Sequence, residues 1–324
     1  MSQALQPAHR IGAVAAASTL PQQPQVGAAA AAAAAALVGA ITGDAAAQTS
    51  HWNYKRGVFH KALIDADRMD NAEFFPFNSF YNVAQGGQSC YGDQLFEVAR
   101  HLASSCNDTG GEGDSDAIDI ALTSPDYLNI LVGRFETAFG SQSSYGPWPV
   151  DPSCKPKIPI EGPWRHASIK GFLSNLSSGK RSVPECGSDD AQADAIAKSV
   201  PVVCVYAGRP DLLDRVETAV RLTQNSDRAV EYAKVAALFL EKCILGTAAS
   251  TEDGGKTANI VIDALTSALQ DKRATFDDEA LELMSLVVKI LKREPSPNFE
   301  EAVNLLSMEP IMKPLLQSPV SLIA

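Results

Sequence analysis

The sequence lacks most of the local patterns that indicate a known chemistry. Its six cysteines are scattered, with no C-x-x-C pair and no histidine at zinc spacing, and no glycine-rich phosphate loop is present. No Ser/His/Asp or Cys/His nucleophile signature can be read either. In a chain of 324 residues, scattered cysteines are typical of reduced and mostly buried thiols, so we expect a cytoplasmic protein.

Basic charge is also scarce. The chain has 27 Lys and Arg residues against 38 Asp and Glu residues, a formal net charge of −11 and a pI of about 4.9. No dense Lys/Arg run interrupts this acidity. A protein of this sign repels phosphate backbones, which argues against nucleic acid as a partner.

The N-terminal part has few charges and many alanines. Residues 26–43 form an uncharged run close to the length of a membrane span, but alanine is only weakly hydrophobic and is the best helix former. We predict a disordered leader over residues 1–25, a tightly packed core helix over 26–47, and no membrane association. The lack of acidic residues before Asp44 also fits a mitochondrial transit peptide, although Arg10 is the only Lys or Arg there.

Strand-type alternation is scarce, and helical spacing of apolar residues dominates. The spacing predicts helices over Tyr91–Ser105, Ala191–Tyr206, Leu212–Leu222, Ser226–Leu245, Thr257–Leu269, Thr275–Leu291 and Asn298–Leu306. Tyr145–Trp164 is too rich in proline for regular helix, and a long irregular loop of this kind often covers a cavity or serves a function.

Two N-terminal segments carry a family resemblance. Gly39–Tyr54 reads GAITGDAAAQTSHWNY, and Phe74–Gln94 reads FFPFNSFYNVAQGGQSCYGDQ. Together they resemble the ADP-ribosylglycohydrolase family, and most closely its branch of J-type lens crystallins and selenoprotein J. Three further segments are similar to that branch: Glu161–Leu173, Val200–Asp227 and Lys272–Met284.

This resemblance covers about residues 26–305 and implies an all-α fold, a compact orthogonal multi-helix bundle. We therefore expect one helical domain over residues 26–310, followed by a divergent tail over 311–324.

The resemblance also implies a metal site. Enzymes of the family hold two Mg²⁺ ions that bind the ribose hydroxyls of ADP-ribose and activate a water molecule, and such ions need several oxygen ligands. The family's Thr-Asp-Asp cluster falls here on Tyr91, Gly92 and Asp93, so that only Asp93 is kept as a candidate metal ligand. The family's second cluster, Gly-Asp-x-Asp-Thr, is not found after residue 303.

A similar motif elsewhere is expected to be unrelated. Gly113-Asp114-Ser115-Asp116-Ala117 resembles the second cluster, but it follows the first one closely and lies in an acidic connection. Short acidic motifs recur by chance, so a solvated loop is the favoured interpretation.

The candidate ligand-binding residues each have a structural alternative. The candidates are His51, Trp52, Ser89, Tyr91, Asp93, Gln94 and Arg165. Trp52 and His51 could stack on and hydrogen-bond a ligand, or form a packed turn. Asp93 could contact a ligand, or only complement the helix dipole. Arg165 could bind a phosphate, or form a salt bridge.

Two functions remain open at this point. The first is an ADP-ribosylglycohydrolase-like or J-crystallin-like protein that is catalytically degenerate, uses no cofactor, and has a structural or small-molecule-binding role. The alternative is a Mg²⁺-dependent hydrolase of ADP-ribose-type N- or O-glycosidic bonds, with Asp93 and Asp44 as its catalytic carboxylates. The small-molecule partner expected in either case is ADP-ribose or a related compound.

Overall fold

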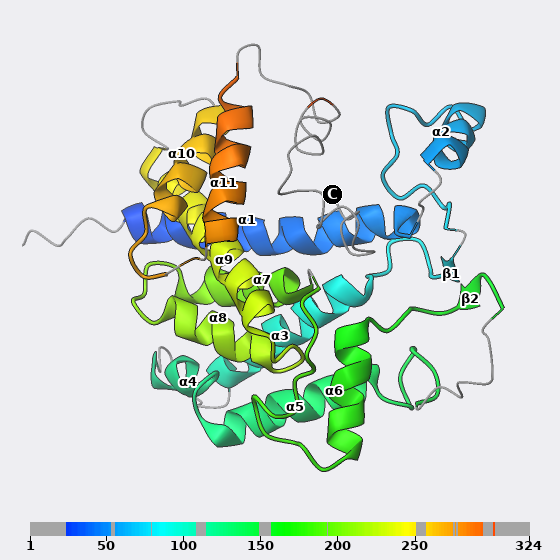
Figure 1. Ribbon diagram of the computed structural model, residues 1–324, viewed down its shortest axis with the longest axis horizontal. Helices are drawn as coiled ribbons and strands as arrows, with labels where there is room; N and C mark the ends of the chain where they lie inside the picture. Colours follow the sequence, from blue (N-terminus) through cyan, green and yellow to red (C-terminus); the bar gives the residue numbers. More distant parts are fainter. Residues whose placement is uncertain are drawn as a thin grey trace, which may run out of the picture.

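The computed structural model describes residues 24–52, 56–78, 80–107, 115–148, 157–192, 194–250, 257–274, 276, 278–293 and 301. These residues form an almost entirely helical protein, which confirms the all-α prediction (Figure 1). Eleven α-helices are present among them: α1 (Pro24–Ala47), α2 (Arg56–Asp65), α3 (Cys90–Asn107), α4 (Ser115–Ile120), α5 (Pro125–Phe139), α6 (Ala167–Ser177), α7 (Asp194–Tyr206), α8 (Leu212–Arg221), α9 (Asp227–Ser250), α10 (Thr257–Leu269) and α11 (Asp278–Leu291). A 3₁₀ turn, η1 (Gln48–Ser50), follows α1.

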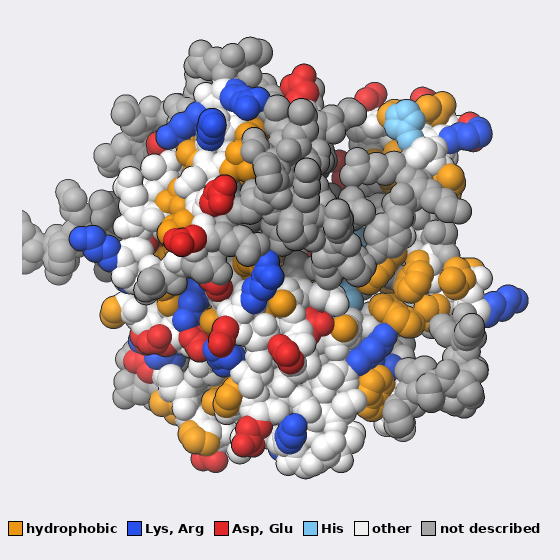
Figure 2. Space-filling view, viewed as in Figure 1, with side chains coloured by type: hydrophobic (Ala, Val, Ile, Leu, Met, Phe, Trp, Pro, Cys, Tyr) orange, Lys and Arg blue, Asp and Glu red, His pale blue; other side chains and the backbone are white. Residues whose placement is uncertain are grey.

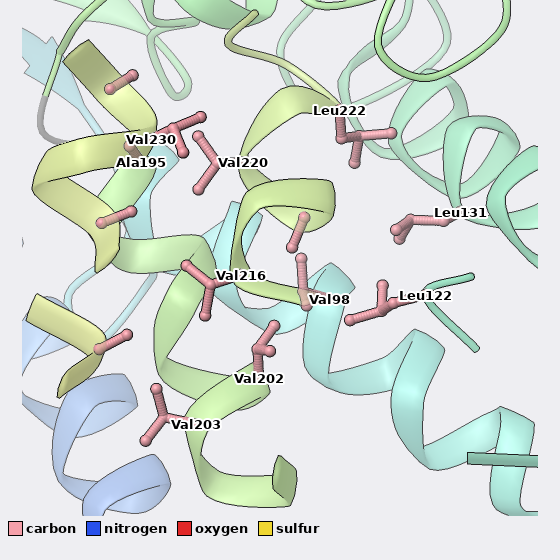
Figure 3. Close-up of a cluster of buried hydrophobic side chains, with 14 of the residues drawn as sticks. Val98, Leu122, Leu131, Ala195, Val202, Val203, Val216, Val220, Leu222 and Val230 are labelled. Atoms are coloured by element: carbon pink, nitrogen blue, oxygen red, sulfur yellow. The ribbon is translucent and has the colours of Figure 1, made fainter. Parts of the chain in front are cut away.

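The core lies where α7 packs against α3, α8 and α9. Figure 3 shows Val98 of α3, Val202 and Val203 of α7 and Val216 of α8 meeting there, and all four are fully buried. Helix α8 can pack into this core because its apolar residues recur three to four positions apart and form one buried face. Helix α5 packs on α3 and extends the same core.

The helix expected over residues 26–47 is present as α1, but the tight packing expected for it is wrong. Val38 is 62% exposed, and Ala33 and Ala45 are the buried hydrophobic residues of α1 among those described. Among the described elements, α1 packs mainly against α9 and α7 and also contacts α3 (Figure 1). Its exposed described residues share the other face: Gly27, Ala30, Ala31, Ala34, Ala35, Val38, Gly39, Thr42, Gly43 and Ala47.

Helix α1 also contributes to a candidate membrane span. The segment Gly27–Ser50 is the one described segment that is apolar and long enough to cross a membrane, by length and composition only, and 11% of its most apolar window is buried. The expectation of no membrane association stays a prediction.

The helix predicted over Thr257–Leu269 is found with the same ends as α10. The other predicted helices that lie within the described residues have shifted ends, and several further helices were not expected from the spacing. Residues 191–206 become α7, which starts at Asp194, and residues 275–291 become α11, which starts at Asp278. Helices α2, α4, α5 and α6 were missed, and α4 begins at Ser115, within the segment that was expected to be a solvated loop. Most of the leader, Asp114, the tail and all but Glu301 of the helix expected over 298–306 lie outside the described residues.

A short parallel pairing brings the proline-rich segment to the rest of the protein. Strand β1 (Tyr81–Asn82) pairs with β2 (Ile160–Glu161), with Tyr81 opposite Ile160. This contact places the residues before α3 beside the residues before α6. The starts of both helices, the end of α1 and η1 therefore meet in one corner of the molecule.

Candidate functional site

The end of α1 is joined to the start of α3 through Asp44. The main-chain amide of Ser89 donates to Oδ2 of Asp44 at 2.7 Å, and the Ser89 hydroxyl donates to Oδ1 at 2.5 Å. Ser89 is buried, and its hydroxyl also accepts a hydrogen bond from the amide of Tyr91 at 3.1 Å. Both oxygens of Asp44 are therefore engaged by the turn that begins α3.

Gly92 is buried directly against Asp44. A Cβ at residue 92 would lie 2.1 Å from Oε1 of Gln88 and 2.3 Å from Oδ2 of Asp44. Gln88 is held in place because its Nε2 donates to the carbonyl of Ile41 at 3.1 Å. The space that a side chain at residue 92 would need is thus filled by Asp44 and Gln88.

Asp93 lies in the first turn of α3 and faces Tyr145. The Tyr145 hydroxyl donates to Oδ2 of Asp93 at 2.6 Å. Burial raises the pKa of Asp93 to about 6; the hydrogen bond from Tyr145 opposes this shift, and the charges of Asp44 and Glu97 add to it. Burial also raises the pKa of Tyr145 well above its usual value, so that Tyr145 remains a neutral donor.

Asp93 is expected to make stability depend on pH between about 4 and 6. Its pKa is about 6 in the folded protein and about 3.9 when unfolded, so the folded state binds the proton more tightly. The contribution of Asp93 to stability therefore falls as the pH rises through this window. We expect Asp93→Asn to gain stability relative to the parent as the pH rises from 4 to 7, measured by urea unfolding.

The exposed Asp70→Asn variant controls for the loss of any one carboxylate. If the difference in stability between the parent and Asp93→Asn stayed constant over this pH range, the raised pKa of Asp93 would be contradicted.

An aromatic cluster lines the same corner and consists of Trp52, Phe80, Tyr91, Trp164 and His166. Trp52 stacks on Phe80 with 5.4 Å between ring centroids, and Phe80 meets Trp164 edge-on at 5.4 Å. The rings of Tyr91 and His166 are 4.1 Å apart, and His51 lies edge-on to Tyr91 at 6.0 Å. Figure 2 shows hydrophobic side chains gathered on the side of the molecule that carries β1 and β2.

Two features of the aromatic cluster are typical of a binding surface. Trp52 has a φ of 64°, a left-handed backbone conformation that is uncommon for a large side chain and is found more often at functional sites. Lys170 of α6 places its Nζ 3.7 Å from the centre of the Trp164 ring. The corner therefore combines aromatic faces with a cation.

Comparison with known sequences assigns the family. The sequence model described as ADP-ribosylglycohydrolase matches residues 26–314. The chain belongs to the ADP-ribosylglycohydrolase family. Crystallin J1A of Tripedalia cystophora is 30% identical over 210 residues, and Crystallin J1B of the same organism is 29% identical over 209 residues. Each alignment covers 64% of this chain and 57% of the relative, so the chain spans little more than half of these relatives; no solved structure matches.

The described residues do not fit the two-magnesium centre that the family resemblance implies. No group of three or more His, Cys, Asp or Glu side chains among them could hold a metal ion. Asp44 directs both oxygens to Ser89, Asp93 accepts from Tyr145, and Gly92 supplies no ligand. Mg²⁺ requires several oxygen ligands in octahedral order, which two carboxylates that already accept hydrogen bonds do not provide.

Gln94 was expected to contact a ligand but lies inside the protein. It is fully buried, and its Nε2 donates to Oδ2 of Asp194 at 3.1 Å. Its Oε1 accepts a hydrogen bond from Nζ of Lys198 at 3.2 Å. Because α3 turns by about 100° per residue, Gln94 faces the core while its neighbour Asp93 faces the corner.

Arg165 was a candidate for binding a phosphate or for forming a salt bridge, and the structure gives it a third role, as a donor to main-chain carbonyls. Its side chain is buried, and its guanidinium lies over the rings of Tyr145 and Trp148. It donates to four main-chain carbonyls at 3.0 Å or less, those of Phe139, Gly140, Tyr145 and Gly146. A rigid fork of five donors suits this task, and it fixes the loop that carries Tyr145.

Sequence reasoning missed several residues of this corner. Tyr145 falls in the proline-rich segment that was expected to serve a function, but nothing in its pattern marked it as the partner of Asp93. Lys170 lies in a segment quoted for the family resemblance, and its spacing from Trp164 gave no signal. The buried partners of Gln94, which are Asp194 and Lys198, carried a weak signal, since charged residues within an apolar helix must find partners.

Proposed function

We propose that this domain is a non-hydrolytic member of its family that binds ADP-ribose or a related nucleotide. The main support for the absence of hydrolysis is the filled space at Gly92, the position at which the family has a metal-binding aspartate. With Asp44 and Gln88 in that space, the pair of carboxylates that would share a metal is not available. The two relatives are named as crystallins, which supports the non-hydrolytic role.

The aromatic cluster supports the binding part of the proposal. Stacking of a base on an aromatic side chain contributes about 1–3 kcal/mol. Lys170, which lies over Trp164, would attract the phosphates of the same ligand. The residues we assign to ligand contact are therefore Trp52, Tyr91 and Trp164, with His51 and Lys170 as hydrogen-bonding and charged partners.

Binding of ADP-ribose is expected to stabilise the protein equally in EDTA and in MgCl₂. A ligand present at one hundred times its Kd adds about 2.7 kcal/mol of stability, which a thermal unfolding scan detects. The variant Trp164→Ala is expected to weaken binding by about 1–3 kcal/mol because it removes one stacking face. Phe75→Ala is the matched control, since Phe75 stacks on Phe77 in a separate aromatic group.

Three results would contradict parts of this proposal. A thermal shift that requires Mg²⁺ would show that the protein has a metal site. No shift at millimolar ADP-ribose would leave a purely structural role. If Trp164→Ala and Phe75→Ala weakened the binding of ADP-ribose equally, the aromatic cluster would not be the binding surface.

One observation favours the hydrolase as a second candidate. A carboxyl group with a pKa of about 6 beside a second carboxylate is suited to general acid catalysis near neutral pH, and Asp93 has this property. Incubation with a mono-ADP-ribosylated protein tests this candidate. Release of ADP-ribose that is lost in Asp93→Asn would establish hydrolysis, and no release would exclude it for such substrates.

A further inference from the structure

A cavity lies between α8, α9 and the segment that joins α10 to α11, on a different part of the molecule from the aromatic cluster (Figure 1). Its volume is about 580 Å³. Pockets that bind small molecules have volumes of roughly 300–1,000 Å³. None of the described residues that line this cavity belongs to the aromatic cluster, so it is an independent candidate for a binding site.

Two cations on the cavity wall have N–H groups to spare. Nζ of Lys234 donates to Oε2 of Glu217 at 2.5 Å and makes no other hydrogen bond with a described residue, which leaves two of its three donors. Arg221 donates from Nε to Oε1 of Glu217 at 2.8 Å. It also donates to Asn225 at 2.8 Å and to Asp227 at 2.6 Å, so that two of its five donors remain. The Lys234 and Arg221 side chains are 23% and 20% exposed, so a ligand can reach both of them.

The wall also provides a carboxylate and an apolar surface. Glu231 of α9 lines the cavity one helical turn after Asp227. Val230 of α9 and Phe276, which precedes α11, contribute apolar side chains. The third cation, Arg273, already donates to Asp271 and Glu241. Arg273 therefore holds the wall in place, and Lys234 and Arg221 are the cations that can accept a ligand.

The balance of charge disfavours a simple anion or cation as the ligand. The described residues of the wall comprise three cations and three carboxylates: Arg221, Lys234 and Arg273, and Glu217, Asp227 and Glu231. The whole chain carries a formal net charge of −11, which repels anions from solution. A molecule that carries one charge of each sign avoids this repulsion and can pair with both kinds of group.

We propose that this cavity binds a small zwitterion with an apolar side chain, of the class of apolar amino acids and dipeptides. The carboxylate of the ligand accepts hydrogen bonds from the spare N–H groups of Arg221 and Lys234. Its ammonium group donates to Glu231, and its side chain packs on Val230 and Phe276. Bound in this way, the ligand joins the segment before α11 to α8 and α9.

The test uses the dipeptide leucyl-leucine and two analogues that each lack one charge. Millimolar leucyl-leucine is expected to raise the thermal unfolding midpoint of the full chain. N-acetyl-leucyl-leucine lacks the ammonium group, and leucyl-leucine amide lacks the carboxylate. Isothermal titration calorimetry is expected to show that each analogue binds at least about tenfold more weakly than the dipeptide, because each loses a hydrogen bond to a charged group. No stabilisation by the dipeptide, or equal affinity for all three compounds, would overturn the proposal.

Variants of the wall test where the dipeptide binds. Lys234→Met and the nearly isosteric Glu231→Gln are each expected to weaken its binding at least about tenfold. Lys61→Met is the matched control, since Lys61 also pairs with a carboxylate but lies on the surface of α2. Titrations are run well below the unfolding temperature of each variant, so that a loss of stability is not counted as a loss of affinity. Parental affinity in both wall variants would overturn the proposal.

Trp164→Ala separates this cavity from the corner that carries the aromatic cluster. The variant is expected to bind leucyl-leucine with the affinity of the parent, because Trp164 does not line the cavity. Weaker binding of the dipeptide by Trp164→Ala than by Lys234→Met would place it in the corner, and would overturn the proposal without affecting the binding of ADP-ribose there.

Discussion

Replacing Gly92 with alanine is expected to destabilise the protein by about 1–3 kcal/mol, although alanine is the better helix former. The added Cβ would overlap Oδ2 of Asp44 and Oε1 of Gln88. Neither group can move without loss, because Asp44 accepts two hydrogen bonds from Ser89 and Gln88 donates to the carbonyl of Ile41. Urea unfolding of the two proteins measures the difference.

Gly133 of α5 supplies the matched control. It is a helical glycine, and a Cβ added there would meet nothing within 4 Å. Gly133→Ala is therefore expected to gain up to about 1 kcal/mol of stability, the ordinary gain in a helix. If Gly92→Ala were as stable relative to the parent as Gly133→Ala, the side chains of Asp44 and Gln88 could move aside at little cost. This result would contradict the filled space at residue 92.

The same position allows a direct test of the family's aspartate. Gly92→Asp is expected to cost more than Gly92→Ala, because it adds a second carboxylate beside Asp44 as well as the overlap. Added Mg²⁺ is not expected to recover the lost stability. Recovery by Mg²⁺ would show that one substitution rebuilds a metal site, and would contradict the filled-space argument.

The helices that were predicted carry a local signal in the sequence. In α8, the repeat of apolar residues within ten positions specifies the buried face, and no distant information is needed. For α1 the same reasoning identified the helix and misjudged its environment. An alanine-rich sequence determines that a helix forms, but the neighbours that would cover it belong to other parts of the chain.

The site was predictable only in part for a related reason. The family motif led to Gly92 and Asp93, and to the conclusion that metal ligands are missing there. Tyr145, which bonds Asp93, is 52 residues away, and Asp194, which bonds Gln94, is 100 residues away. Such pairings depend on how α3, α6 and α7 pack together, and residue spacing along one helix does not contain that information.

The largest single effect is expected from Asp194→Ala, which should destabilise the protein by about 3–5 kcal/mol. Asp194 is fully buried and accepts hydrogen bonds from Gln94 and Ser168. Its removal leaves His166 and Lys198 buried without their carboxylate partner. Asp65→Ala is the control, because Asp65 pairs with Lys61 on the surface, with side-chain exposures of 60% and 73%. That pair is expected to contribute less than about 1 kcal/mol.

A thermodynamic cycle with Lys198→Met separates the buried charge pair from general packing. In the parent, Lys198→Met removes the donor that Nζ supplies to Gln94 and Gln224, so it is expected to destabilise the protein. In the Asp194→Ala background, Lys198 has lost the carboxylate charge that stabilises it, and the same substitution relieves a buried unpaired cation. We therefore expect the double variant to lose less stability than the two single variants lose when added together, by about 0.5–3 kcal/mol. Additive losses would mean that Asp194 and Lys198 contribute independently, and that the buried cluster is not held together by their charges.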